Sequence, residues 1–321
     1  MEVGKTPLSY AAAACAAVRD AMRLDPRVVV VGEDVGRGGV FQQYKGLQQE
    51  FGAARVIDTP ISEATILGAG VGMALAGLKP VVEMRVIDFA LCAVDEMVNQ
   101  AAKARYMFGG QGRVPLVARM PIGLWSGSAA QHSQSLEAWF THVPGLVVVA
   151  PATPQDNYSL LRAAIDCGDP VIYMEHKELW GLEGEVSPRD IPLGKANVVR
   201  EGKDLTLVTW SRTVHAALQA ETKKSVEIID LRTLWPWDRE TVLSSVRKTG
   251  ELLVVHEAVQ AAGFGAEIAA TVARDGFWDL DAPIERIGAH TTPPPYAPDL
   301  ERAWLPDRAD IADAIRRLAA A

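Results

Sequence analysis

The sequence has few cysteines, and none of them forms a pattern that would pair or bind zinc. Cys15, Cys92 and Cys167 lie far apart, and no CxxC spacing occurs. A disulfide framework and a structural zinc site are therefore excluded. We expect the three side chains to be small buried apolar groups.

Basic clusters and long apolar runs are also missing. Lys and Arg number 32 against 40 Asp and Glu, which gives a net charge of -8 without any basic run. Nucleic acid is not an expected partner, because neutralising its phosphates requires clustered cations. No apolar stretch reaches the ~18 to 20 residues of a membrane span. The alanine-rich start follows Ser9 as a capped helix would, so we expect a soluble, cytoplasmic protein.

Phosphate-binding and hydrolase signatures are absent as well. The glycines of GAGVGMALAG (68–77) do not fit G-x-G-x-x-G, because Met73 stands three residues after Gly70. They also lie within an apolar helical stretch, not in the turn where a pyrophosphate would meet backbone N–H groups. We predict that they let this helix pack closely against a neighbour. No G-x-x-x-x-G-K-[ST], G-x-S-x-G or H-E-x-x-H occurs either.

Short runs rich in Val and Ile alternate with helical segments along the whole chain. The first set of strands is expected at 27–34, 54–59, 80–84, 114–119, 145–151 and 170–176. The second set is expected at 204–210, 226–231, 251–258 and 283–289. Runs that are apolar on both faces and separated by helices indicate parallel sheets covered on both sides. We predict an α/β fold of two doubly wound domains, 1–180 and 204–321, joined by a linker at 181–203.

Two residues are candidates for chemistry on local evidence. Glu63 begins a predicted helix directly after a strand, at the sheet edge where ligands of α/β proteins bind. A carboxylate at this position also favours the helix dipole, so a structural role is equally open. His132 lies in a polar loop after a glycine-rich stretch and suits an acid, a base or a phosphate ligand, or an exposed residue without function.

Eight segments carry a specific resemblance over nearly the whole chain. They are GEDVG, DTPISE, GMALAGLKPVVEM, NQAAKARYMFGGQ, AAQHSQSLEAWFTHVPGL, APATPQDN, IDLRTLWPWD and GFGAEIAA. Together they resemble the β subunit of the decarboxylating component of 2-oxoacid dehydrogenase complexes, in the transketolase-like thiamin diphosphate superfamily. The resemblance implies a pyrimidine-binding domain followed by a transketolase C-terminal-like domain.

The resemblance also assigns roles to individual residues. Glu63 matches the glutamate that bonds the pyrimidine nitrogen of thiamin diphosphate and exchanges its proton, which leads to deprotonation of the thiazolium carbon. Ile61 and Phe89 match positions that pack on the pyrimidine ring. Glu33 matches an acid beside that glutamate, on an acidic path between paired sites. His132 matches a histidine on the substrate side that assists proton transfer or the incoming lipoyl group.

Cofactors and partners follow from the same resemblance. The diphosphate and its Mg²⁺ belong to an α subunit with a GDG motif, which this chain lacks. We therefore expect an α₂β₂ heterotetramer, together with a lipoyl-bearing acyltransferase and a small 2-oxoacid or acetoin as substrate. Some relatives hold a structural K⁺ through backbone carbonyls, which maps here to Leu116, Ala164, Cys167 and Asp169.

Two other functions fit the same motifs less closely. One is a carboligase that uses the same cofactor outside a multienzyme complex. The other is a non-catalytic subunit whose C-terminal domain only docks partners, for which the net charge of -8 suits a basic binding domain. Retention of Glu63, Phe89 and His132 argues against the purely structural role. Segments typical of the pyruvate branch and of the acetoin branch both occur, and the acetoin branch is the favoured assignment.

Overall fold

The structure is a computed structural model that describes residues 5–125 and 127–319. Contacts divide the chain into a first unit, up to Ile122 plus Trp139–Leu193, and a second unit, Gly123–Ala138 plus the residues from Gly194 on. The division thus falls within the predicted linker. It differs from the prediction at 123–138, which the sequence placed in the first domain.

The first unit is built on a parallel sheet. Its strands are β2 (Val28–Gly32), β3 (Val56–Asp58), β4 (Lys79–Glu83), β5 (Val117–Arg119), β6 (Val147–Val149) and β7 (Val171–Tyr173). They lie in the order β6-β7-β5-β4-β2-β3, and each neighbouring pair is parallel. Each lies within a run that the Val and Ile pattern indicated, except that β4 begins one residue earlier, at Lys79. Two further strands, β1 (Thr6–Ser9) and β8 (Glu183–Val186), form an antiparallel ribbon that the pattern did not predict.

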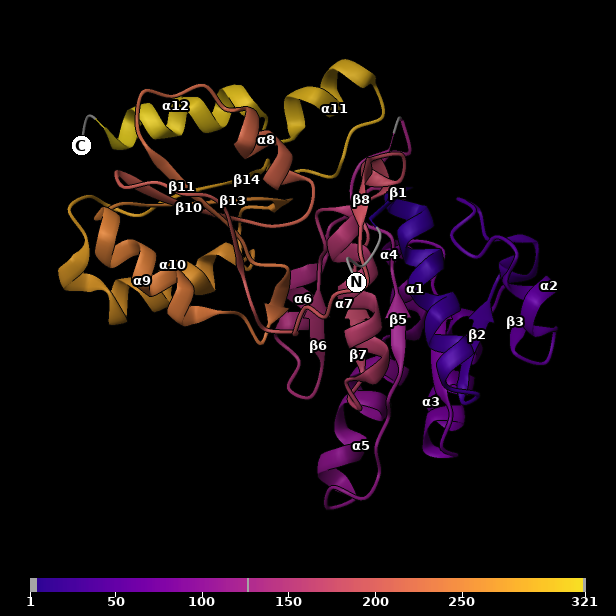
Figure 1. The fold of residues 1–321 in the computed structure, drawn as a ribbon. Helices are drawn as coiled ribbons and strands as arrows, with labels where there is room; N and C mark the ends of the chain where they lie inside the picture. The colour runs from indigo at the N-terminus through magenta and orange to yellow at the C-terminus, as the bar shows by residue number, and fades with distance from the viewer. Residues whose placement is uncertain (1–4, 126, 320–321) are drawn as a thin grey trace. The chain divides into compact units, whose positions relative to one another are not determined.

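Helices cover this sheet (Figure 1). They are α1 (Tyr10–Leu24), α2 (Leu47–Phe51), α3 (Glu63–Leu75), α4 (Ile87–Ala90), α5 (Ala102–Met107) and α7 (Pro154–Asp166). Short helical segments are η1 (Val35–Arg37), η2 (Leu91–Ala93), the π-helical η3 (Glu96–Ala101) and η4 (Lys177–Leu179). The boundary between Ala138 of the second unit and Trp139 of the first falls within the helix α6 (Glu137–Thr141). The buried core joins α1 and α7 to alternate residues of the strands, including Val28, Val81 and Val117.

Local sequence explains where these helices begin. The Ser9 hydroxyl accepts a hydrogen bond from the Ala12 N–H at the start of α1, as predicted. Thr153 caps α7 in the same way, with Pro154 in its first turn. Residues 41–51 have helical spacing, but only α2 forms a helix there, because Gln42 and Gly46 adopt left-handed backbone conformations.

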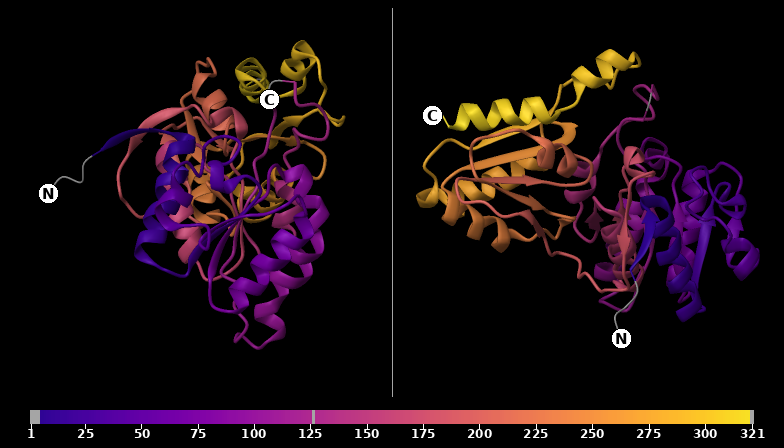
Figure 2. Two further views of the ribbon diagram at one scale, coloured as in Figure 1. Left: turned by 90° about the vertical axis from the view of Figure 1, so that its right-hand side faces the viewer. Right: turned by 45° about the horizontal axis from the view of Figure 1, so that its top comes forward.

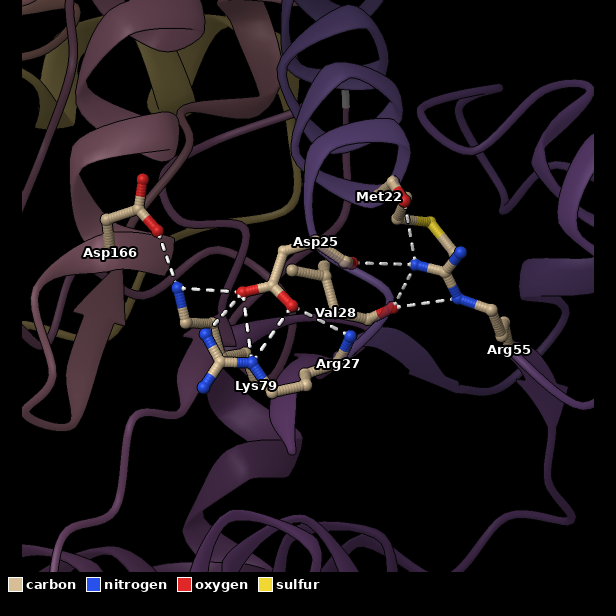
Figure 3. A network of polar contacts seen from close by, with 7 residues as sticks. All are labelled: Met22, Asp25, Arg27, Val28, Arg55, Lys79 and Asp166. Atoms are coloured by element: carbon tan, nitrogen blue, oxygen red, sulfur yellow. Dashed lines mark hydrogen bonds and ion pairs between the residues drawn. The ribbon is translucent and has the colours of Figure 1, made fainter. Parts of the chain in front are cut away.

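A polar network closes the amino edge of the first sheet (Figure 3). Arg55 donates to the carbonyls of Met22, Asp25 and Val28 at 2.8–3.2 Å, where α1 ends and β2 begins. At the start of β4, Lys79 Nζ lies 2.7 Å from Asp166 and 3.2 Å from Asp25. The network joins the ends of α1 and α7 to two strands, at the edge opposite to the carboxyl ends.

The second unit has a smaller mixed sheet. Its strands are β9 (Asn197–Arg200), β10 (Leu205–Thr209), β11 (Val226–Asp230), β13 (Leu252–Val259) and β14 (Glu285–Ala289), and β12 (Thr233–Trp235) is a further short strand. The order is β14-β13-β10-β11-β9, with β9 antiparallel to β11 and the other pairs parallel. The sequence predicted the four parallel strands but not β9 or β12.

Helices lie on both faces of this second sheet. They are α8 (Thr213–Gln219), α9 (Arg239–Thr249), α10 (Gly265–Asp275), α11 (Pro298–Trp304) and α12 (Arg308–Leu318), with a short turn η5 (Phe277–Asp279). The yellow α12 lies with the red-orange α8 on one face, and the orange α9 and α10 lie on the other, as Figure 1 and the right-hand view of Figure 2 show. The doubly wound α/β prediction is therefore confirmed for both units.

Three local predictions need correction or comment. The proline-rich TTPPPYAPDL segment (291–300) favours an extended chain, but Pro298 begins α11, since proline suits the first helical turn. Cys15 is buried and Cys167 half-buried, but Cys92 is exposed, so the burial prediction was wrong for that side chain. Within residues 5–125 and 127–319, no helix combines the length and apolar character needed to cross a membrane.

Candidate functional site

The carboxyl edge of the first sheet brings chemically active residues into one row. Its register aligns the last residues of five neighbouring strands, which are Asp58, Gly32, Glu83, Arg119 and Tyr173. Ligands of α/β proteins bind beyond this edge, because the loops that follow the strands open there. The candidate site therefore begins in the residues that come next along the chain.

Glu33 and Glu63 come together beyond this edge. Glu33 follows the last residue of β2, and its side chain is only 12% exposed. Burial raises the pKa of the Glu33 carboxyl, and the nearby charge of Glu63 raises it further. Arg85 acts in the opposite direction from 4.0 Å and also pairs with Asp34 at 3.3 Å. The Glu33 carboxyl therefore responds both to the negative charge of Glu63 and to the positive charge of Arg85, at the position where ligands of this fold class bind.

Glu63 is the first residue of α3, directly after the Ser62 cap position. The Ser62 hydroxyl bonds the Thr65 hydroxyl at 2.8 Å and makes no capping bond to the backbone. The Glu63 carboxylate thus lies at the positive end of the helix dipole, an interaction that stabilises the start of α3. The structural and functional readings of Glu63 both agree with this placement.

Two apolar residues flank the pair along the chain. Ile61 precedes α3 and is 76% exposed, and Phe89 is half-buried in α4. An exposed isoleucine next to a carboxylate offers an apolar surface for a ring or for a partner. The structure therefore keeps Glu33, Ile61, Glu63 and Phe89 in the first unit, in the segments that follow β2, β3 and β4.

Behind this site a polar network is buried within the first unit. Glu83 accepts hydrogen bonds from Gln43 at 3.0 Å and from the Tyr44 hydroxyl at 2.5 Å. Arg119 is fully buried, stacks over the Tyr44 ring at 4.7 Å and pairs with Glu175 at 2.6 Å. Two buried carboxylates therefore face a single arginine.

This excess of negative charge changes the proton affinity of Glu83. Burial raises the pKa of Glu83 to about 7, against the opposing attraction of Arg119. Its two donors, Gln43 and Tyr44, belong to the loop between η1 and α2. Gly32 lies against Glu83 so closely that a Cβ on Gly32 would come within 2.7 Å of the Glu83 Cβ. Glu83 thus supports both the end of β2 and the loop beyond it.

His132 belongs to the second unit, unlike the other predicted residues. Its side chain is exposed, in a loop whose ends meet where Gly123 N–H donates to the Gln134 carbonyl at 3.1 Å. Ala129 within this loop has a left-handed backbone, and His132 N–H donates to its carbonyl. The loop therefore turns tightly just before the histidine.

The residues mapped to a K⁺ site lie around the end of α7. They are Leu116, Ala164, Cys167 and Asp169. The carbonyl of Leu116 accepts from Val171 N–H at 2.8 Å, and that of Ala164 accepts from Cys167 N–H at 3.3 Å. Backbone carbonyls at a helix C-terminus carry partial negative charge, which suits a cation. The Asp169 carboxylate pairs with Arg105 instead.

The sequence motifs did not reveal two residues that influence the predicted site, Arg85 and Glu83. Arg85, two residues beyond the end of β4, is the cation next to Glu33. Its position at the carboxyl edge was the available signal, because charged residues there face the ligand crevice. The sequence places Glu83 only as one acid within the strand expected at 80–84. The buried arrangement with Tyr44 and Arg119 joins three distant segments, which no local pattern reveals.

A cavity of about 540 Å³ lies in the second unit between β14 and α12. Residues of β14, α11 and α12 line it, including Arg286, Trp304 and Asp313. None of the predicted site residues lines it. The candidate site rests on the chemistry at the carboxyl edge of the first sheet rather than on enclosed volume.

Comparisons with known families match both units. Residues 6–181 match the transketolase pyrimidine-binding domain, and residues 194–311 match the transketolase C-terminal domain. Among solved structures, a split gene transketolase, described as an inactive beta4 tetramer, is similar with a TM-score of 0.79. The similarity covers 98% of each chain at 19% identity, and it shows the fold alone.

Curated relatives are similar over nearly their full length. The pyruvate dehydrogenase E1 component subunit beta-1 of Arabidopsis thaliana is 46% identical, over 94% of this chain and 86% of the relative. The acetoin:2,6-dichlorophenolindophenol oxidoreductase subunit beta of Cupriavidus necator is 45% identical, over 94% of each chain. The 2-oxoisovalerate dehydrogenase subunit beta of Bacillus subtilis is 42% identical, over 97% and 98%. With both domains matched in order, the chain belongs to the transketolase-like family of 2-oxoacid and acetoin dehydrogenase β subunits.

Proposed function

We propose that this chain is the β subunit of a thiamin diphosphate-dependent dehydrogenase that acts on a 2-oxoacid or on acetoin with an α subunit. The relatives bear the names of pyruvate, acetoin and 2-oxoisovalerate enzymes, so the substrate lies within this class. The observation that carries the proposal is the placement of Glu63 beside Glu33 at the carboxyl edge of the first sheet.

The residues around this pair fit the aminopyrimidine half of the cofactor. Glu63 would exchange a proton with a ring nitrogen, for which a carboxylate at a helix N-terminus is suited. Ile61 and Phe89 would pack against the ring. When bound, thiamin diphosphate supplies the carbon nucleophile that attacks the substrate ketone. Glu33 and Arg85 would set the charge around Glu63, since they share one electrostatic cluster with it.

His132 would act on the substrate side, where it would move a proton or meet the lipoyl group that accepts the acyl product. Mg²⁺ and the diphosphate would be held by the α subunit, in an α₂β₂ heterotetramer. A lipoyl-bearing acyltransferase would receive the product. These parts of the proposal rest on the family relationship and on the motif around His132.

A structural K⁺ is a separate part of the proposal. The carbonyls of Leu116, Ala164 and Cys167, with that of Asp169, would provide its ligands near the negative end of α7. A higher melting temperature in KCl than in NaCl of equal ionic strength would support this site. Equal melting temperatures in the two salts would contradict it.

Reconstitution tests the main proposal. The chain is mixed with its α subunit, thiamin diphosphate, Mg²⁺ and a lipoyl domain, and pyruvate, branched 2-oxoacids and acetoin are each supplied. We expect acyl transfer with one of them, and we expect Glu63→Gln to reduce it by a factor of about 10² or more, because an amide cannot exchange the proton.

The matched control is Glu185→Gln, which removes a carboxylate from an exposed ion pair with Lys5 in the same unit. This variant should keep full activity. Full activity in Glu63→Gln would contradict the proposal. Product formation without any transfer to the lipoyl domain would favour the carboligase instead.

A further inference from the structure

The loop that carries His132 is anchored to the second unit rather than lying free on its surface. It comprises residues 123–125 and 127–138, which belong to that unit. A hydrogen bond between Gly123 N–H and the Gln134 carbonyl closes it at 3.1 Å. Such a loop has one conformation only if its interior residues are also held.

The first anchor is at Leu124. Its side chain is buried in a small apolar cluster with Ala289, Trp304 and Leu305. Its backbone N–H donates to the Glu257 carboxylate at 3.0 Å, and that carboxylate is itself buried on β13. The start of the loop is thus fixed by apolar packing and by a charge-assisted hydrogen bond.

The second anchor is at Gly127, five residues before the histidine. Its N–H lies 2.9 Å and 3.1 Å from the two carboxylate oxygens of Glu301 on α11. Glu301 is only 7% exposed. Gly127 has a left-handed backbone with φ of 75°, which a side chain would strain, so glycine lets the N–H point at the carboxylate.

The third anchor is at the far end of the loop, where the loop supplies the carboxylate and the rest of the second unit supplies the donor. The buried Glu137 accepts a hydrogen bond from Trp210 Nε1 at 3.1 Å, and Trp210 stacks on the buried His256. Three carboxylates therefore hold the segment on both sides of His132. A buried carboxylate is costly unless it keeps its partners, and Glu257 has a second one in Arg212 at 3.9 Å, so these contacts favour one held position of the loop.

We infer that Glu257 and Glu301 are positioning residues for His132, which fix its loop through the N–H groups of Leu124 and Gly127. The inference rests on the proposed role of His132 and extends it. The second unit then contributes to the chemistry and does more than dock partners. Removal of one such hydrogen bond should change the equilibrium constant between the anchored and the released conformation of the loop by about tenfold to hundredfold, toward the released one.

Hydrogen exchange followed by mass spectrometry tests the anchor on the full chain without its α subunit. Glu301→Met keeps the shape of the side chain and removes the acceptor, whereas Glu301→Gln keeps one acceptor oxygen. We expect peptides within 127–138 to exchange about ten times faster in the Met variant, and the Gln variant to restore most of the protection. Unchanged exchange in Glu301→Met would overturn the inference.

Asp299 on the same helix provides the matched control. Its side chain is exposed and pairs with Arg302 on the same helix, so Asp299→Asn removes a charge from α11 and leaves the Glu301 carboxylate in place. Exchange within 127–138 should match wild type in this variant. Peptides of α9 serve as a folding check, and faster exchange confined to the loop supports the anchor. If Glu301→Met also speeds exchange in α9, the test is repeated at the other anchor. Glu257→Met should then speed exchange in the loop, and Glu257→Gln should preserve most of the protection.

The activity of the reconstituted enzyme tests whether the anchor acts through His132. Glu301→Met should lower kcat and leave the KM for thiamin diphosphate unchanged. In a His132→Ala background, Glu301→Met should cause no further loss, because the positioned group is already gone. Multiplied losses in the double variant would overturn the positioning role. The exchange result stands without any activity, so failure of the proposed function is distinguishable from failure of the anchor.

Discussion

Glu33 and Glu63 lie close enough that the charge of one changes the proton affinity of the other. They come from segments that follow neighbouring parallel strands, β2 and β3, whose carboxyl ends meet at one edge. Burial is the larger cause of the raised pKa of Glu33, and the Glu63 carboxylate adds to it. The Glu63 carboxylate therefore contributes to the proton affinity of Glu33 from the segment that follows the neighbouring strand.

Glu63→Gln should lower the pKa of Glu33 toward its ordinary value, although burial will keep it raised. Carbon-13 NMR of glutamate-labelled chain measures this titration, with Glu33→Gln to assign the signal. Glu185→Gln removes a distant exposed carboxylate and should leave the titration unchanged. An unaltered midpoint in Glu63→Gln would show that burial alone raises the Glu33 pKa.

Glu83 should make the stability of the chain depend on pH. Its pKa is raised from 4.5 to about 7, so its contribution is fully present below pH 4.5 and is lost as the pH rises through 7. The full difference corresponds to about 3 kcal/mol of unfolding free energy. The groups that face Glu83 are Arg119, Tyr44, Glu175 and Gln43.

Glu83→Gln removes this titration, and the Tyr44 hydroxyl can turn to keep a hydrogen bond. Urea unfolding at a series of pH values between 5 and 8 measures the effect. The stability of wild type minus that of the variant should fall as the pH rises, and the same difference for Glu185→Gln should stay flat. A difference that rises with pH would contradict the raised pKa.

The architecture of both units was predictable because it rests on local patterns. Runs such as 27–34 are apolar on both faces, which only a covered parallel strand accommodates, and β2 lies within that run. Asp307 and Ser9 begin helices through their own side chains, so helix starts were also readable. The strands β1 and β8 were missed, because they depend on pairing with each other across most of the chain.

The candidate site was only partly predictable from the sequence. Glu63 and Glu33 were identified by motif, and the fold accounts for their proximity through the order of β2 and β3. The anchors of the His132 loop, Glu257 and Glu301, come from β13 and α11. Bonds between a side chain and a backbone more than a hundred residues away leave no periodic trace in a sequence.

Arg119 should be far more costly to remove alone than together with its partner. Arg119→Met leaves Glu175 buried without its cation, and we expect a loss of about 3–5 kcal/mol of unfolding free energy. Adding Glu175→Gln removes the unpaired charge and should recover part of this loss, since Asn157 still bonds the side chain at that position. Urea unfolding of the wild type, both single variants and the double variant gives the coupling. Additive losses would contradict a direct ion pair.

The glycines of α3 provide a last, sharply contrasting pair of variants. A Cβ on Gly70 would lie 2.7 Å from Val82 Cγ2 and 2.9 Å from Leu116 Cδ1, so this glycine permits close packing as predicted. A Cβ on Gly72 would meet no atom within 4 Å. Gly70→Ala should therefore destabilise the isolated chain by about 1–3 kcal/mol through overpacking. Gly72→Ala should stabilise it by about 0.5–1 kcal/mol, because alanine favours the helix. Thermal and urea unfolding of the two variants decide the matter, and equal effects would mean that close packing is not the reason for Gly70.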